Sequence, residues 1–130
     1  MARILVVDDD PGIRGVLRRA FERQGHTVVL AGDGLEGARA WREHGADVVF
    51  LDIHMPEMDG IELLAQLRAA SPALPVIAMS GGDQTHRLSL LRDALLLGAR
   101  AALAKPFSLD EVNAALARAL EGRGGEQAVP

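Results

Sequence analysis

The fold class is decided by the stretch VVFLD at residues 48–52, in which an unbroken apolar run ends in the carboxylate of Asp52. Such a run is typical of a strand that is buried on both faces, as in a parallel α/β sheet. In an open sheet of this kind, ligands bind outside the carboxyl ends of the strands. We therefore expect Asp52 to lie where a buried strand ends and a functional site begins.

Three other apolar runs end in polar residues in the same way. They lead into carboxylates, a hydroxyl and an ammonium: Asp8 and Asp9 after residues 4–7, Ser80 after residues 76–79, and Lys105 after residues 101–104. Because the carboxyl ends of parallel strands meet at one edge of a sheet, we expect these side chains to gather into a single site.

Strand-like and helix-like patterns alternate five times along the chain. We predict strands at about residues 4–7, 27–31, 47–51, 74–79 and 100–104. A helix is predicted after each strand, starting at the N-caps Asp10, Asp33, Asp59 and Ser108 and, for the fourth helix, near Thr85. Five such units with right-handed crossovers form an α/β fold, a doubly wound five-stranded parallel sheet in the order 2-1-3-4-5.

The chain is predicted to form one domain over residues 1–121. Gly122, Gly124 and Gly125 then interrupt the helical pattern, since glycine is a poor helix former. Residues 122–130 are therefore expected to form a flexible C-terminal tail.

The composition excludes several classes of protein. With 48% hydrophobic residues and a mean hydropathy of +0.11, general disorder is excluded. A net charge of −4 and 3% aromatic residues argue against nucleic acid as a partner. There is no cysteine for a disulfide or a thiolate metal site, no signal-like N-terminal region, and no apolar stretch near the roughly 20 residues of a membrane span. We expect a soluble cytoplasmic domain that binds no membrane.

In the predicted strand order the first and third strands are neighbours, so Asp8, Asp9 and Asp52 meet. Two carboxylates about 4 Å apart repel by roughly 4 kcal/mol at an effective dielectric constant of 20, so three of them require a cation or protonation. An all-oxygen site suits a hard ion such as Mg²⁺. Asp52, alone at the end of the central strand, is the best candidate nucleophile, and Ser80 and Lys105 are placed to bind phosphoryl oxygens.

Four motifs carry a resemblance to a known family: VVDDDP, LDIHMPEMDG, PVIAMS and GAxxxLAKPF. Over about residues 3–121 the chain resembles the receiver domain of two-component response regulators, including the single-domain, chemotaxis-regulator-like proteins. The resemblance implies a flavodoxin-like (βα)5 fold. It also implies phosphorylation of Asp52 to an aspartyl phosphate by a phosphohistidine on a sensor histidine kinase or a histidine phosphotransfer protein.

The resemblance assigns further roles residue by residue. Asp8, Asp9, Asp52 and the backbone carbonyl of His54 would bind Mg²⁺. Ser80 would be the switch hydroxyl, and Lys105, before a cis Lys105–Pro106 bond, would pair with the phosphate. The implied protein is a phosphorylation-dependent switch in a phosphorelay, with no enzymatic activity beyond self-phosphorylation and autodephosphorylation.

The expected output is a protein contact. A leucine-rich segment at residues 88–97 is read either as a well-buried amphipathic helix with some exposed leucine or as part of a hydrophobic surface for a downstream partner. That surface would be formed by the fourth helix, fifth strand and fifth helix, and homodimer formation stays open. No helix-turn-helix pattern follows residue 121, so direct DNA binding is not expected.

The chain departs from the family pattern in the region that couples the site to this surface. Ala102 stands where the family commonly has Tyr or Phe, and the chain from Ser80 to Lys105 is longer than usual. The aromatic side chain normally swings inward as the hydroxyl moves toward the phosphoryl group. We expect the loop at residues 81–85, which contains two adjacent glycines, to replace this coupling.

Three alternatives remain open at this stage. The chain could be the receiver part of a longer regulator with a DNA-binding or enzymatic output domain. It could be a haloacid-dehalogenase-like phosphatase using the D-x-D at residues 8–10, in which case Asp8 would be phosphorylated instead of Asp52. It could also be a degenerate receiver that only docks, although the complete set of site residues argues against this.

Overall fold

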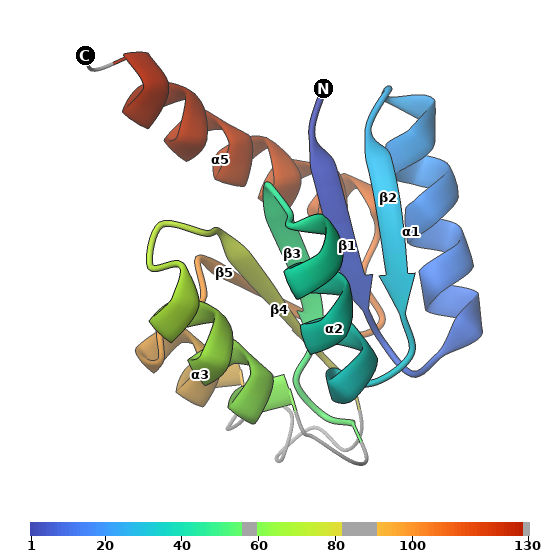
Figure 1. Cartoon of the computed structure of the whole chain (residues 1–130). Helices are drawn as coiled ribbons and strands as arrows, with labels where there is room; N and C mark the ends of the chain where they lie inside the picture. The colour runs from blue at the N-terminus through green and yellow to red at the C-terminus, as the bar shows by residue number, and fades with distance from the viewer. Residues whose placement is uncertain (56–59, 82–90, 129–130) are drawn as a thin grey trace.

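In a computed structural model of the chain, residues 1–55, 60–81 and 91–128 are described, and they form a sheet flanked by helices (Figure 1). Residues 91–96 are also helical. The other elements are β1 (Arg3–Val7), α1 (Pro11–Arg23), β2 (Thr27–Ala31), α2 (Gly34–His44), β3 (Val48–Asp52), α3 (Gly60–Ala70), β4 (Val76–Ser80), β5 (Ala101–Ala104) and α5 (Leu109–Ala128).

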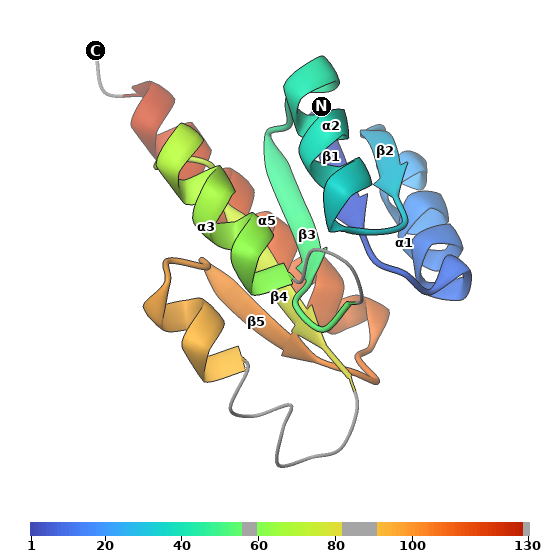
Figure 2. The same cartoon turned by 60° about the horizontal axis from the view of Figure 1, so that its bottom comes forward.

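All four strand pairs of the sheet are parallel, and the strand order is β2-β1-β3-β4-β5. The predicted fold class and strand order are therefore confirmed. Since the strands run in one direction, their carboxyl ends share one edge of the sheet, which is turned toward the viewer in Figure 2. β1 and β3 are neighbours at the centre, with Val7 opposite Leu51 in the register.

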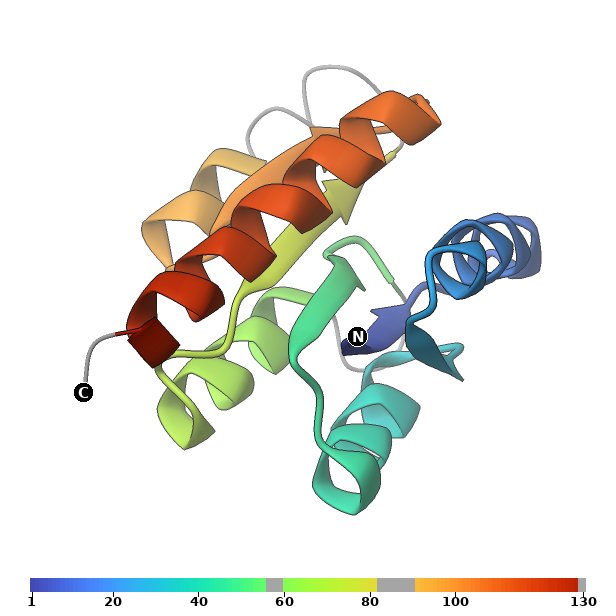
Figure 3. The ribbon, with the colours of Figure 1, turned by 90° about the horizontal axis from the view of Figure 1, so that it is seen from above.

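Helices cover both faces of the sheet, with α1 and α5 on one side and α2 and α3 on the other (Figure 3). Successive strand residues point to opposite faces, so a strand covered on both sides must be apolar throughout. In β3, Val49 and Leu51 pack with α2 and α3, whereas Val48 and Phe50 pack with α1 and α5. This double burial explains the unbroken apolar run at residues 48–51.

Side-chain caps set the predicted helix starts. Asp10 accepts a hydrogen bond from the Gly12 amide at 2.8 Å, which begins α1. At α5, the Ser108 hydroxyl accepts from the Glu111 amide at 3.1 Å while the Glu111 carboxylate accepts from the Ser108 amide at 3.0 Å, a reciprocal capping box. The predicted caps at these helices are confirmed, as is Asp33 at α2, which accepts from the Glu36 amide. Asp59 and Thr85 lie outside the described residues.

The start of α3 packs directly on the end of β3. A Cβ atom on Gly60 would lie 2.2 Å from the Cα of Ile53 and 2.3 Å from the carbonyl oxygen of Asp52. No side chain fits there, so only glycine allows α3 to begin this close to the strand end. The contact fixes the backbone on which Asp52 stands.

The structure differs from several of the predicted boundaries. Asp52 and Ser80 are the last residues of β3 and β4, inside the strands, and β4 starts at Val76 because Pro75 has no N–H to donate. α5 continues to Ala128, beyond the predicted end near Glu121. A helix that is already nucleated adds one hydrogen bond per residue, which offsets the unfavourable glycine propensity. The flexibility of residues 122–130 stays a prediction. Within the described residues, no helix has the length and apolarity to cross a membrane.

Candidate functional site

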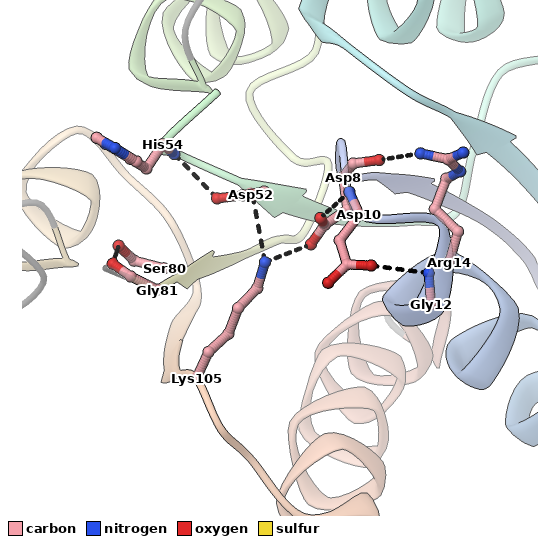
Figure 4. A network of polar contacts seen from close by, with 9 residues as sticks. All are labelled: Asp8, Asp10, Gly12, Arg14, Asp52, His54, Ser80, Gly81 and Lys105. Atoms are coloured by element: carbon pink, nitrogen blue, oxygen red, sulfur yellow. Dashed lines mark hydrogen bonds and ion pairs between the residues drawn. The ribbon is translucent and has the colours of Figure 1, made fainter. Parts of the chain in front are cut away.

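The polar residues predicted to gather do lie at the carboxyl edge of the sheet (Figure 4). Asp8 directly follows β1, Asp52 ends β3, Ser80 ends β4 and Lys105 directly follows β5. Because β1 and β3 pair with Val7 opposite Leu51, the next residues of the two strands emerge at the same level. The parallel register thus brings together side chains that are far apart in the sequence.

Three carboxylates form the centre of the site. Asp8, Asp9 and Asp52 each offer one oxygen, and these oxygens lie within 4.8 Å of one another. Asp8 and Asp52 are buried, with 0% and 3% of their surface exposed, whereas Asp9 is exposed. The donor set contains only oxygen and carries more negative than positive charge, which fits a hard divalent cation such as Mg²⁺.

Lys105 reaches between the two buried carboxylates. Its Nζ lies 2.8 Å from Asp8 Oδ2 and 3.2 Å from Asp52 Oδ2. The contact with Asp8 is an ion pair whose angles are not those of a well-aligned hydrogen bond. Burial alone would lower the pKa of Lys105, but its contact with Asp8 and the charges of both carboxylates outweigh burial, so its pKa is raised. Lys105 therefore stays charged and partly compensates the acidic cluster.

Asp52 is held in place by its own chain. Its Oδ1 accepts a hydrogen bond from the His54 amide at 2.9 Å, while Oδ2 faces Lys105. Burial, assisted by the negative charge of Asp8, raises the pKa of Asp52 to about 6, although the His54 amide and Lys105 act in the opposite direction. The surroundings of Asp52 thus destabilise its ionised form, and an added cation would stabilise that form.

Asp8 is held by hydrogen bonds to its carboxylate, its amide and its carbonyl oxygen. Its Oδ1 accepts from the Asp10 amide at 2.9 Å, and its own amide donates to the Ala31 carbonyl at 3.1 Å. Its carbonyl oxygen accepts from Arg14 Nη1 at 2.7 Å. Arg14 was not among the predicted site residues, because an arginine one turn into an amphipathic helix is typical of a surface residue. The sequence did hold one signal for its role: Arg14 follows the N-cap Asp10 by four residues, which places it close to the end of the first strand.

Ser80 is fully buried beside the end of β3, since its neighbour Met79 pairs with Asp52. Its hydroxyl donates to the Gly81 carbonyl at 3.3 Å, so it is engaged with its own backbone. The His54 side chain is exposed and points away from the carboxylates (Figure 4). The Lys105–Pro106 bond is cis, as the resemblance implied. Most of the predicted coupling loop, from residue 82 on, lies outside the described residues.

Comparison with known proteins agrees with this architecture. Residues 4–117 match the family described as the response regulator receiver domain. The response regulator MprA of Mycobacterium ulcerans is 41% identical over 110 residues, which is 85% of this chain and 46% of MprA. The regulatory protein AtoC of Escherichia coli is 39% identical over 119 residues, 92% of this chain and 25% of AtoC. The chain therefore spans about half the length of MprA and a quarter of AtoC.

Solved structures show the same fold. NtrX from Brucella abortus superposes with a TM-score of 0.90 at 32% identity, covering 98% of this chain and 28% of NtrX. A response regulator receiver domain protein from Clostridium thermocellum superposes with a TM-score of 0.87 at 28% identity, covering 95% of this chain and 98% of that protein. Family match, relatives and fold agree, and the chain belongs to the receiver domains of two-component response regulators.

Proposed function

We propose that Asp52 is the phosphoacceptor of this receiver domain and that it takes its phosphoryl group from a phosphohistidine. The observation that carries the proposal is the placement of Asp52, a nearly buried carboxylate 3.2 Å from a lysine ammonium and within 4.8 Å of two further carboxylates. We favour Asp52 as the nucleophile because it ends the central strand β3, with Asp8 and Asp9 next to the end of the neighbouring strand β1 and Lys105 within reach. The family match decides against the haloacid-dehalogenase-like alternative, in which Asp8 would react.

The proposed step is an in-line transfer. A carboxylate oxygen of Asp52 attacks the phosphorus of the phosphohistidine, the new O–P bond forms as the N–P bond breaks, and the imidazole leaves as a neutral ring after taking up a proton. Asp52 must be ionised to attack. A pKa of about 6 leaves most of it ionised at pH 7 and keeps it a better nucleophile than an ordinary aspartate.

Asp8, Asp9 and Asp52, with the backbone carbonyl of His54, would hold Mg²⁺. When bound, the ion would supply positive charge that offsets the carboxylates and the phosphoryl oxygens. The fit rests on the three clustered carboxylates, whose oxygens give the site a local excess of negative charge.

Lys105 and Ser80 would contact the phosphoryl group on Asp52. Lys105 would pair with a phosphoryl oxygen in place of a carboxylate, and the Ser80 hydroxyl would turn from the Gly81 carbonyl to donate to the phosphoryl group. Each charge-assisted contact contributes about 1.5–3 kcal/mol, against about 5.5 kcal/mol for a full two-state reversal. With a small Ala102 in β5, we place the coupling in the loop at residues 81–85. Water would hydrolyse the aspartyl phosphate at the same site. Apart from self-phosphorylation, this autodephosphorylation would be the only reaction that the domain catalyses.

We further propose a cytoplasmic setting, with a sensor histidine kinase or phosphotransfer protein as donor and no direct contact with nucleic acid or membrane. The downstream partner would bind the surface formed by the helix at residues 91–96, β5 and α5. Leu95, Leu96 and Leu97 are 48%, 80% and 43% exposed near it. The same surface could form a homodimer.

A second candidate differs only in the output. The chain covers 46% of MprA and 25% of AtoC, which favours a receiver that belongs to a longer regulator with a DNA-binding or enzymatic output domain. In that case the same site would control the attached domain. Size determination of the protein made from its native gene would distinguish the two.

The test is to map the phosphorylated residue. Acetyl phosphate with Mg²⁺ should label the parent protein on Asp52, as read by mass spectrometry after reduction of the acyl phosphate. Asp52→Asn should not be labelled, whereas Asp47→Asn, at the opposite edge of the sheet, should be labelled like the parent. Equal labelling of Asp52→Asn and the parent would disprove the assignment.

A further inference from the structure

The guanidinium of Arg14 connects the first helix to the carboxylate cluster without touching a carboxylate. Arg14 lies in the first turns of α1 and is half-buried, and its Nη1 donates to the Asp8 carbonyl oxygen at 2.7 Å. Figure 4 shows it approaching Asp8 from the side opposite Lys105. A Cβ atom on Gly32 would lie 3.4 Å from the same Nη1, so the guanidinium also lies close to the loop between β2 and α2.

The carbonyl that Arg14 holds belongs to the peptide unit that joins Asp8 to Asp9. A planar peptide turns as a whole, so a bond to the carbonyl of Asp8 also sets the direction of the Asp9 backbone. The Asp8 carboxylate has its own supports, the Asp10 amide and Lys105. The Asp9 carboxylate is exposed, and among the described residues no side-chain hydrogen bond or ion pair orients it.

From these contacts we infer that Arg14 is a positioning residue for the metal site. By holding the Asp8 carbonyl against α1 and the β2–α2 loop, it directs the otherwise unsupported Asp9 carboxylate toward Asp8 and Asp52. An arginine suits this task because its planar fork can serve the carbonyl with one N–H while other N–H groups face the neighbouring loop. The inference rests on the proposed function, in which Asp9 is a Mg²⁺ ligand.

The test compares Arg14→Gln and Arg14→Lys with the parent and with Arg18→Gln. Arg18 is a matched control, because it is one turn further along α1, is exposed, and pairs only on the surface with Glu22 at 3.4 Å. Groups that orient metal ligands from outside typically change metal affinity 10–100-fold. We expect Arg14→Gln to weaken Mg²⁺ binding roughly tenfold by titration calorimetry, Arg14→Lys to lie between Arg14→Gln and the parent, and Arg18→Gln to match the parent.

A second readout needs no metal. In the metal-free protein, loss of the Arg14 bond should shift the ¹³C resonance of the Asp8 carbonyl and speed hydrogen exchange at the Asp9 and Asp10 amides, in Arg14→Gln but not in Arg18→Gln. An unchanged Mg²⁺ affinity in Arg14→Gln and Arg14→Lys, whether or not the unfolding midpoint falls, would overturn the positioning role. If the parent itself binds no Mg²⁺, the proposed metal site fails instead, so the two failures are distinguishable.

Discussion

The two edges of the sheet hold their polar groups in opposite ways. Within the described residues, every buried polar or charged side chain lies at the carboxyl edge: Asp8, Asp52 and Ser80. At the amino edge the Asp47 carboxylate accepts from the Arg3 amide at 2.8 Å, in an exposed contact. Burial raises the free energy of the charged side chains at the carboxyl edge, whereas water stabilises the charged side chains at the amino edge. The carboxyl edge therefore holds unfavourable electrostatic energy that a bound cation would relieve.

The largest effect is expected from removing the Lys105 ammonium, which lies between the two buried carboxylates of the carboxyl edge. Lys105→Met leaves two buried carboxylates without their partner, which costs about 3 kcal/mol or more of unfolding free energy. Urea denaturation at pH 7 in the presence of EDTA measures this loss. Arg118→Met, on the exposed side of α5, should stay within about 0.5 kcal/mol of the parent. An equal loss in the two variants would mean that Lys105 acts only as surface charge.

Asp52→Asn should have the opposite sign. The pKa of Asp52 in the folded protein is about 6, above its ordinary 3.8, so the folded state binds more protons than the unfolded state between about pH 4 and 6. The stability that Asp52 contributes is therefore present at low pH and is lost as the pH rises through 6. The neutral amide avoids this loss, so the metal-free variant should gain up to ~3 kcal/mol at pH 7 and little at pH 4. A variant equally or less stable than the parent at pH 7 would contradict the burial argument.

Mg²⁺ should stabilise the carboxyl edge of the parent. At ten times the dissociation constant, a ligand that binds only the folded state adds about 1.4 kcal/mol. Thermal unfolding with and without Mg²⁺ measures the gain, and CaCl₂ at equal concentration controls for the choice of ion. Asp8→Asn should lose most of the response because it removes a buried ligand carboxylate. Equal stabilisation of the parent and Asp8→Asn would place the ion elsewhere.

The smallest effect is expected at the amino edge. Asp47→Ala removes the hydrogen bond to the Arg3 amide and should lower the unfolding free energy by about 1 kcal/mol. Neither Mg²⁺ nor acetyl phosphate should change this difference. A stabilised Asp47→Ala variant would show that the amino edge also stores unfavourable charge, and the contrast between the edges would disappear.

Most of the fold could be predicted because its signals are local. The apolar run before Asp52, the cap at Asp10 and the capping box of Ser108 and Glu111 each depend on residues close in sequence. The end of α5 could not, since glycines that weaken a helix do not decide whether an existing helix continues past them. The membership of the site was predictable as well, because parallel strands place their last residues at one edge.

The sequence alone determined which side chains would meet: a polar residue after each of four apolar runs, in a parallel order that brings Asp8, Asp52 and Lys105 to one edge. Only the tertiary structure decided how they interact. The ion pairs of Lys105 with both carboxylates, the raised pKa of Asp52 and the bond from Arg14 to the Asp8 carbonyl all depend on packing between distant segments. The physical reason is that residue order sets which strand ends are neighbours, whereas desolvation and hydrogen-bond geometry are properties of the packed side chains themselves.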